Sequence, residues 1–154
     1  MADKKISVLY VDDEENNLFS FKAVFRVKYQ VYTAISGDEA LKILGEKHIE
    51  VIITDQRMPN MTGVEFLEQV IEKFPDPMRL LLTGYADMNA VVDAVNKGKI
   101  FHYLSKPWNE EELDITINRA YEAYLQKEKL KEENKALGTS NDQLEFLLRQ
   151  KLLS

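Results

Sequence analysis

The sequence predicts an α/β fold built on a doubly wound, five-stranded parallel sheet with helices on both faces. Five short apolar runs alternate with stretches whose apolar residues recur at helical spacing. The runs are mostly β-branched, leucine or aromatic residues, which is typical of strands buried on both faces. Strands that alternate with helices pair in parallel through right-handed crossovers. The expected strands cover residues 6–11, 30–35, 51–54, 79–83 and 100–105.

Each stretch between the strands carries one apolar stripe, as expected for a helix packed against a sheet. The members of these stripes are Leu18, Phe21 and Phe25, then Ala40, Ile43 and Leu44, then Val64, Leu67, Val70 and Ile71, and finally Ala90, Val91, Ala94 and Val95. Glycine and proline punctuate the boundaries between the elements, where turns are expected.

The chain changes character after Asn109, where strand-like runs cease and strong helix formers dominate. We expect one extended C-terminal helix over residues 109–137. Its first turns should pack on the sheet through a face that contains Leu113, Ile117, Ala120 and Tyr121. Beyond Tyr124 we expect no further surface of the globular domain to cover the helix.

Leucines at positions 130, 137 and 144 are spaced by seven residues, which predicts a coiled-coil seam and a parallel homodimer. The alternate seam positions would then be Lys127, Asn134, Asn141 and Leu148. Gly138 is a helix-stop signal, so an alternative is that residues 141–153 fold back. The expected division is a globular domain at residues 1–125 and a helical, coiled-coil segment at residues 126–154.

Composition restricts the classes of function. The net charge of −6 and the pI near 5.0 argue against a nucleic-acid-binding surface, which is usually basic. The absence of cysteine excludes disulfides and thiolate metal sites. The sequence contains neither a signal peptide nor an apolar run long enough for a membrane span, so we expect a cytoplasmic protein without membrane contact.

Polar residues follow the expected strands where ligands bind in doubly wound sheets, outside the carboxyl ends of the strands. Asp12 and Asp13 follow the first strand, Asp55 follows the third, Thr83 ends the fourth and Lys106 follows the fifth. Clustered carboxylates repel one another unless a cation lies between them, and oxygen-only ligands suit Mg²⁺. A lysine and a hydroxyl beside the metal suit phosphoryl transfer, with Asp55 as the carboxylate nucleophile.

Four separated motifs resemble the receiver domain of two-component response regulators over residues 5 to about 125. They are LYVDDE at 9–14, ITDQRMPNMTGVEFL at 53–67, LLLTGYAD at 80–87 and YLSKPW at 103–108, in the usual order and spacing. The resemblance implies a flavodoxin-like sheet of order 2-1-3-4-5. It also implies that a sensor histidine kinase or a phosphotransfer protein donates a phosphoryl group to Asp55.

The resemblance assigns further roles to individual residues. Asp12 and Asp13 would hold Mg²⁺, with Asp13 the direct ligand, and the backbone carbonyl of Arg57 would complete the set. Thr83 would bond the phosphoryl group, Lys106 would pair with it before a cis proline, and Tyr103 would turn inward as the switch aromatic. Arg57 and Tyr85 would flank the path of hydrolytic water, which predicts slow self-dephosphorylation. The residues that carry these roles are Asp12, Asp13, Asp55, Arg57, Thr83, Tyr85, Tyr103 and Lys106.

Other interpretations of these residues remain open. The two acids could cap the first helix, Thr83 could be an ordinary strand end, and Tyr103 could simply pack. The protein could be a Mg²⁺-dependent aspartyl-phosphate phosphatase, although Arg57 stands where such hydrolases carry a second acid. It could also be a coiled-coil scaffold with an inert receiver. The resemblance favours a signalling receiver that catalyses only its own phosphorylation and dephosphorylation, and that controls a partner or an output domain beyond Ser154.

Overall fold

The computed structural model describes residues 4–84, 87–133, 145–146 and 148–150. Strands and helices alternate from β1 to α5, as the apolar runs predict. The elements are β1 (Ser7–Val11), α1 (Glu15–Phe25), β2 (Gln30–Ala34), α2 (Gly37–Glu46), β3 (Val51–Asp55), α3 (Gly63–Lys73), β4 (Met78–Thr83), α4 (Met88–Asn96), β5 (His102–Ser105) and α5 (Glu110–Glu133). The expected strands are therefore confirmed to within two residues at each end.

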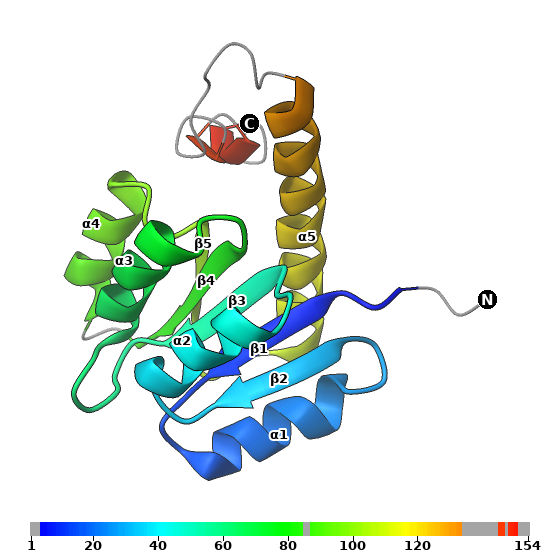
Figure 1. Ribbon diagram of the computed structural model, residues 1–154. Helices are drawn as coiled ribbons and strands as arrows, with labels where there is room; N and C mark the ends of the chain where they lie inside the picture. Colours follow the sequence, from blue (N-terminus) through cyan, green and yellow to red (C-terminus); the bar gives the residue numbers. More distant parts are fainter. Residues whose placement is uncertain (1–3, 85–86, 134–144, 147, 151–154) are drawn as a thin grey trace.

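The five strands form one parallel sheet of order β2-β1-β3-β4-β5, so the predicted fold class is confirmed (Figure 1). Strands β1, β3 and β4 are buried along their whole length. Side chains that alternate along them enter two apolar clusters. One cluster packs under α1 and α5, and the other under α2, α3 and α4, which gives three layers.

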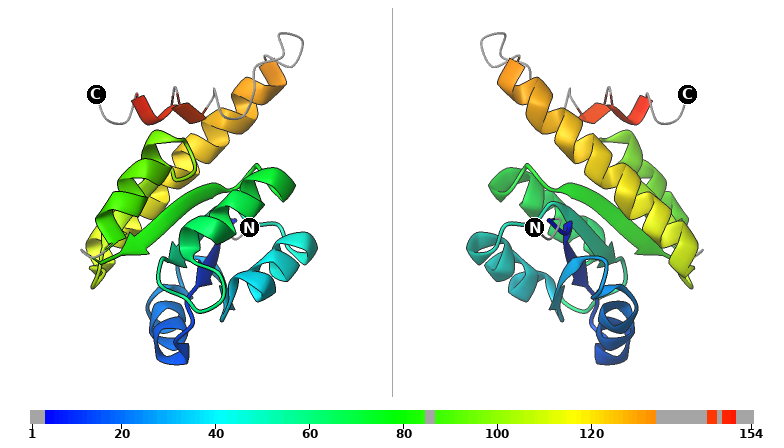
Figure 2. Two further views of the ribbon diagram at one scale, coloured as in Figure 1. Left: turned by 90° about the vertical axis from the view of Figure 1, so that its left-hand side faces the viewer. Right: turned by 90° about the vertical axis from the view of Figure 1, so that its right-hand side faces the viewer.

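Helix α5 covers the sheet through the predicted face and then extends beyond it (Figure 2). Leu113, Ile117 and Ala120 are fully buried, and Tyr121 packs against the same cluster. The helix is continuous across the division expected at residues 125 and 126, and its predicted last turn, residues 134–137, lies outside the described residues. Within the described ranges, no helix is long and apolar enough to cross a bilayer.

The expectation that no surface of the globular domain covers α5 beyond Tyr124 is wrong. Lys127 is fully buried and donates a hydrogen bond to the carbonyl of Pro75 at 3.1 Å. Lys131 pairs with Asp76 at 2.6 Å. The α3–β4 loop therefore reaches the helix for two further turns. The sequence pattern did not predict this contact, because it indicates where a loop connects two elements and not which surface the loop packs against.

Burial lowers the pKa of Lys127 to about 8, and the charge of Arg79 acts in the same direction, while Glu145, Asp76 and Glu128 raise it. Between that value and the ordinary 10.5, the unfolded chain holds a proton that the folded chain has released. The free energy of unfolding should therefore rise with pH in this window, by at most about 3 kcal/mol.

Urea unfolding at several pH values between 7 and 10, compared with Lys127→Met, measures this contribution. The variant should lack the rise, because methionine keeps the apolar stem and removes the titrating group. Other titrating groups are common to both proteins and cancel in the difference. Identical slopes in the two proteins would contradict the assignment.

Candidate functional site

Three carboxylates meet at the carboxyl edge of the sheet. Residues Val11 and Thr54 are register partners on β1 and β3, so Asp12 and Asp55 leave neighbouring strands side by side. Asp12, Asp13 and Asp55 offer oxygen atoms that all lie within 4.8 Å of one another. Asp12 and Asp55 are buried and Asp13 is partly exposed. The structure thus brings together the three acids that the sequence places after β1 and β3.

Lys106 completes the charged part of the site. Its Nζ lies 2.5 Å from Oδ1 of Asp55, and its backbone N–H donates to the carbonyl of Thr83 at 3.0 Å. The Lys106–Pro107 peptide bond is cis, as the sequence resemblance implies. The backbone hydrogen bond to Thr83 and the ion pair with Asp55 hold Lys106 at the end of β4.

The environment of Asp55 raises the pKa of its carboxyl group on balance. Burial raises the pKa of this carboxyl group, and the negative charge of Asp12 raises it further, whereas the hydrogen bond and charge of Lys106 lower it. One ammonium group therefore does not compensate three carboxylates. A divalent cation between them would supply the missing positive charge.

Tyr10 and Asn17 hold Asp12 in place, and reading the sequence missed both. The Tyr10 hydroxyl and the Asn17 side-chain amide donate to Oδ2 of Asp12 at 3.3 and 3.1 Å, while the Glu14 backbone N–H donates to Oδ1 at 2.9 Å. Tyr10 lies two residues before Asp12, so the two-residue period of a strand could have indicated that they share a face. Asp12 closes the turn before α1, in addition to its place in the acid cluster.

Replacing Tyr10 with phenylalanine tests this support. The ring would keep its stacking on Phe21, at 4.2 Å between centroids, and the hydroxyl would be lost together with its hydrogen bond to Asp12. We expect Mg²⁺ affinity to fall by about tenfold, as for other groups that orient a metal ligand. Tyr29→Phe is the matched control, because its hydroxyl bonds Asp114 and Asn118 away from the site. Equal affinities for the two variants would contradict a positioning role for Tyr10.

The β3–α3 loop is closed by backbone and amide hydrogen bonds. The carbonyl of Gln56 accepts from the Gly63 N–H, and its side-chain oxygen accepts from the Val64 N–H, both at 2.9 Å. A Cβ atom on Gly63 would lie 2.4 Å from the carbonyl oxygen of Asp55, so α3 begins in close contact with the end of β3. This contact fixes the backbone that carries Asp55.

Of the residues with predicted roles in switching and phosphate lifetime, the structure describes Thr83, Tyr103 and Arg57. Thr83 is buried, and its hydroxyl donates to the carbonyl of Gly84 at 3.1 Å. Tyr103 is partly buried and packs against the cluster under α2, α3 and α4. The exposed side chain of Arg57 pairs with Asp87 at 3.1 Å. Tyr85 lies outside the described residues.

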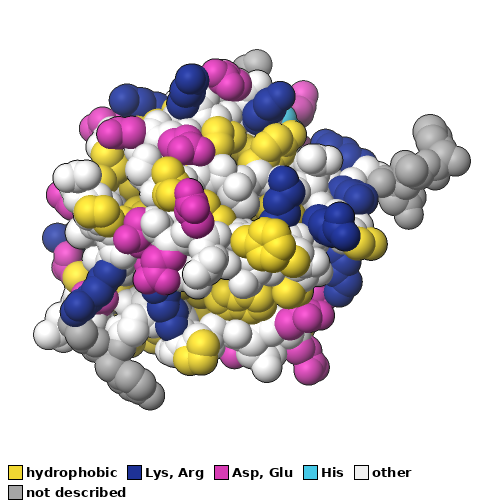
Figure 3. Space-filling model, turned by 90° about the horizontal axis from the view of Figure 1, so that it is seen from below, with side chains coloured by type: hydrophobic (Ala, Val, Ile, Leu, Met, Phe, Trp, Pro, Cys, Tyr) yellow, Lys and Arg dark blue, Asp and Glu magenta, His cyan; other side chains and the backbone are white. Residues whose placement is uncertain are grey.

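A pocket of about 380 Å³ opens beside the acids. Trp108 forms one wall and contacts Phe21 and Phe25 through its ring. Figure 3 shows the face that carries α1, where apolar side chains lie among charges of both signs. The large apolar side chains exposed on α1 and just after it are Phe19, Val24 and Val27. The residues that line the pocket are Tyr10, Asp12, Asn17, Lys106, Pro107 and Trp108.

Comparison with known families agrees with this geometry. The model of the response regulator receiver domain matches residues 8–118, which include the acids and Lys106. The chain belongs to the response regulator receiver family. This receiver domain thus has the fold that the sequence predicts.

Two curated relatives of the receiver domain are regulatory proteins by name. The hydrogenase transcriptional regulatory protein HoxA of Cupriavidus necator is 39% identical over 123 residues, which cover 80% of this chain and 26% of that protein. The regulatory protein AtoC of Escherichia coli is 30% identical over 134 residues, which cover 86% and 29%. The chain thus spans about a quarter of the length of these relatives.

Solved structures resemble this receiver domain over nearly their whole length. A response regulator receiver domain protein from Clostridium thermocellum is 33% identical with a TM-score of 0.73, and the match covers 81% of this chain and 98% of that one. A protein from Rhodopirellula baltica described as an adenylate cyclase is 29% identical with a TM-score of 0.79, and the match covers 88% and 99%.

The donor set fits Mg²⁺. All three side chains offer carboxylate oxygens, which hard divalent cations prefer, and nitrogen or sulfur ligands are absent from the cluster. Arg57, whose carbonyl is the expected fourth protein ligand, lies two residues beyond Asp55 in the β3–α3 loop. Asp13 is the most exposed of the three acids and is therefore the one best placed to contact a hydrated ion directly.

Proposed function

We propose that this receiver domain accepts a phosphoryl group on Asp55 in a Mg²⁺-dependent reaction, with a sensor histidine kinase or a phosphotransfer protein as the donor. The observation that carries the proposal is the position of the Asp55 carboxylate. It ends β3 within the cluster of three acids and touches the ammonium group of Lys106 at 2.5 Å. Membership of the receiver family supports the same donor class.

In the proposed reaction, a carboxylate oxygen of Asp55 attacks the phosphorus of a phosphohistidine. The new O–P bond forms as the P–N bond breaks, and the electron pair leaves with the imidazole nitrogen. Mg²⁺, when bound, neutralises charge on the phosphoryl oxygens. Lys106 supplies a positive charge at the same place, and the Thr83 hydroxyl, which bonds the Gly84 carbonyl in this structure, would turn to one of these oxygens.

The consequence of phosphorylation would be a change on the face formed by α4, β5 and α5. Tyr103 on β5 would turn inward with Thr83, which would repack the neighbouring end of α4. The relatives support an output beyond the receiver, because the transcriptional regulatory protein HoxA and the regulatory protein AtoC are more than three times as long as the matched segment. We infer that this chain controls an output domain or a partner protein rather than a nucleic acid directly.

The alternatives have less support. A phosphatase would need a second acid two positions after Asp55, and Arg57 at that position is an exposed cation paired with Asp87. A scaffold with an inert receiver would not need a cluster of three acids with a paired lysine. The proposed protein is thus a receiver that catalyses only its own phosphorylation and dephosphorylation. Slow dephosphorylation, through Arg57 and Tyr85, remains part of the proposal.

Labelling with a small phosphodonor tests the phosphoacceptor. Incubation with acetyl phosphate and Mg²⁺ should add one phosphoryl group to the wild type, as intact mass spectrometry measures, and none to Asp55→Asn. Asp93→Asn, on the exposed side of α4, is the matched control and should label like the wild type. Equal labelling of Asp55→Asn and the wild type would remove Asp55 as the site. Beryllofluoride with Mg²⁺ should bind only where Asp55 is intact.

A further inference from the structure

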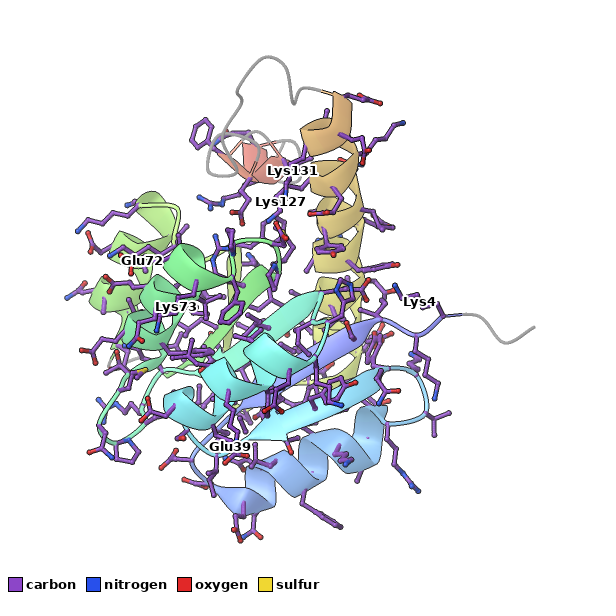
Figure 4. The ribbon with its side chains drawn as sticks, in the orientation of Figure 1. Lys4, Glu39, Glu72, Lys73, Lys127 and Lys131 are labelled. Carbon is purple, nitrogen blue, oxygen red and sulfur yellow. The ribbon has the colours of Figure 1, made fainter. Side chains whose placement is uncertain are left out.

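The C-terminal segment, residues 145–146 and 148–150, lies against the receiver domain at the end of the sheet opposite Asp55. In Figure 1 it lies beside the last turns of α5, above the amino ends of β4 and β5. Its Glu145 is 2% exposed. Nη2 of Arg79 donates hydrogen bonds to the two carboxylate oxygens of Glu145, at 2.9 and 3.0 Å. Lys127 Nζ lies 3.9 Å from the same carboxylate, and Figure 4 labels this lysine on the side of α5 that faces the segment.

The receiver domain holds these two cations in place with its own backbone. Arg79 donates to the carbonyls of Lys99 at 2.9 Å, Pro77 at 3.3 Å and Gly98 at 3.4 Å. Lys127 donates to the carbonyl of Pro75 at 3.1 Å. Arg79 and Lys127 are 1% and 0% exposed, so their charges need an anion within the protein. The structure therefore contains a built carboxylate-binding site.

Two further contacts attach the segment to the receiver domain. Leu148 is 6% exposed and belongs to the apolar cluster under α1 and α5. Arg149 donates to the carbonyl of Val95 at 2.9 Å, in the last turn of α4. The segment thus contacts both α5 and the end of α4.

These contacts use residues that the heptad pattern assigns to a seam between two chains. Lys127 and Leu148 are both predicted seam positions, and both are buried within one chain in this structure. A side chain that fills the core of its own receiver cannot also enter a hole on a partner helix. The docked segment and a coiled coil that runs through Leu148 are therefore mutually exclusive.

We propose that the C-terminal segment is a releasable internal clasp that occupies the carboxylate site of Arg79 and Lys127 and prevents the helical extension from pairing with a second copy of this chain. Release frees Leu148 for the seam, and the partner helix then covers the apolar surface that the segment leaves. The contacts of the clasp involve neither Asp55 nor the other acids of the cluster, so the inference stands apart from the proposed phosphoacceptor function.

Charge reversal at Glu145 tests the clasp in the full chain. Glu145→Lys places a third cation beside Arg79 and Lys127 and should expel the segment. Sedimentation at micromolar concentrations should then show a dimer where the wild type is a monomer, with the dissociation constant lowered by roughly tenfold or more. Glu133→Lys makes the same change at an exposed position of α5 and should remain monomeric. Hydrogen exchange should accelerate at residues 145–150 and 95–99 in Glu145→Lys alone.

Three results would overturn the proposal. The first is a wild-type dimer whose C-terminal segment keeps its protection from exchange, since docking and pairing would then coexist. The second is a Glu145→Lys protein that stays monomeric, or whose segment stays protected. The third is loss of the receiver fold itself in Glu145→Lys and in the milder Glu145→Gln, because a releasable clasp leaves the domain folded. Circular dichroism of both variants reports this last outcome.

Discussion

Replacing Asp13 with alanine is expected to abolish Mg²⁺ binding and the labelling of Asp55 together. Asp13 is the most exposed acid of the cluster and the expected direct ligand, so its loss leaves Asp12 and Asp55, of which Asp55 is already paired with Lys106. Affinity should fall by at least about a hundredfold, since even groups that only orient a ligand contribute ten- to hundredfold. Labelling should fall with it, because the phosphoryl oxygens lose the cation that neutralises them.

The fluorescence of Trp108 provides a measurement of Mg²⁺ binding. This residue is the only tryptophan of the chain and lines the same pocket as Asp12 and Lys106, so its fluorescence should report Mg²⁺ titration directly. Asp38→Ala removes a carboxylate from the exposed first turn of α2 and should leave both the titration and the labelling unchanged. Normal labelling of Asp13→Ala, or normal wild-type labelling in EDTA, would refute the metal assignment.

Gly63→Ala is expected to produce the largest loss of stability of any methyl-sized substitution near the site. The added Cβ would meet the Asp55 carbonyl oxygen at 2.4 Å and the Gln56 Cα at 3.0 Å, and neither backbone atom can turn aside. Overpacking of this kind costs about 3 kcal/mol. The start of α3 must move away from β3, so the Asp55 carboxylate should also shift relative to Lys106 and label more slowly.

Gly45→Ala is the matched control for this effect. A Cβ at Gly45 would meet only the ring of Phe74, at an ordinary 3.8 Å. Alanine also favours the helical conformation of α2, so this variant should be more stable by about 0.5 kcal/mol. Urea unfolding of the two variants and the wild type measures both shifts. A Gly63→Ala protein as stable as the wild type would show that the β3–α3 contact relaxes freely.

The sequence predicted most of the site because its residues occupy simple positions in a regular pattern. Asp12, Asp55 and Thr83 stand at or just after the ends of buried strands, and parallel strands bring their carboxyl ends to one edge. Tyr10 was missed because an aromatic residue inside an apolar run is read as core, and its hydroxyl direction depends on the neighbouring helix. The residues around Tyr10 in the sequence do not indicate which helix packs against its ring.

The contacts of the C-terminal segment could not be predicted for a related reason. Arg79 begins a buried strand and Glu145 lies in a polar stretch, so each has an ordinary interpretation by itself. Their pairing joins residues 66 positions apart, and neither the strand pattern nor the heptad pattern relates the two. The heptad spacing of leucines remains in the sequence, and the coiled-coil dimer stays a prediction that the clasp experiment tests.

The long separation between Arg79 and Glu145 has a consequence for biosynthesis. The two residues are 66 positions apart, and the carboxylate is made after every strand of the sheet. Domains of a growing chain begin to fold from the amino-terminal side, so β4 and α5 can assemble while Arg79 and Lys127 still lack their anion. Until Glu145 leaves the ribosome, Arg79 and Lys127 must pair with water or with a carboxylate of another molecule. The nascent receiver therefore exposes an acid-binding site that the finished chain closes by itself.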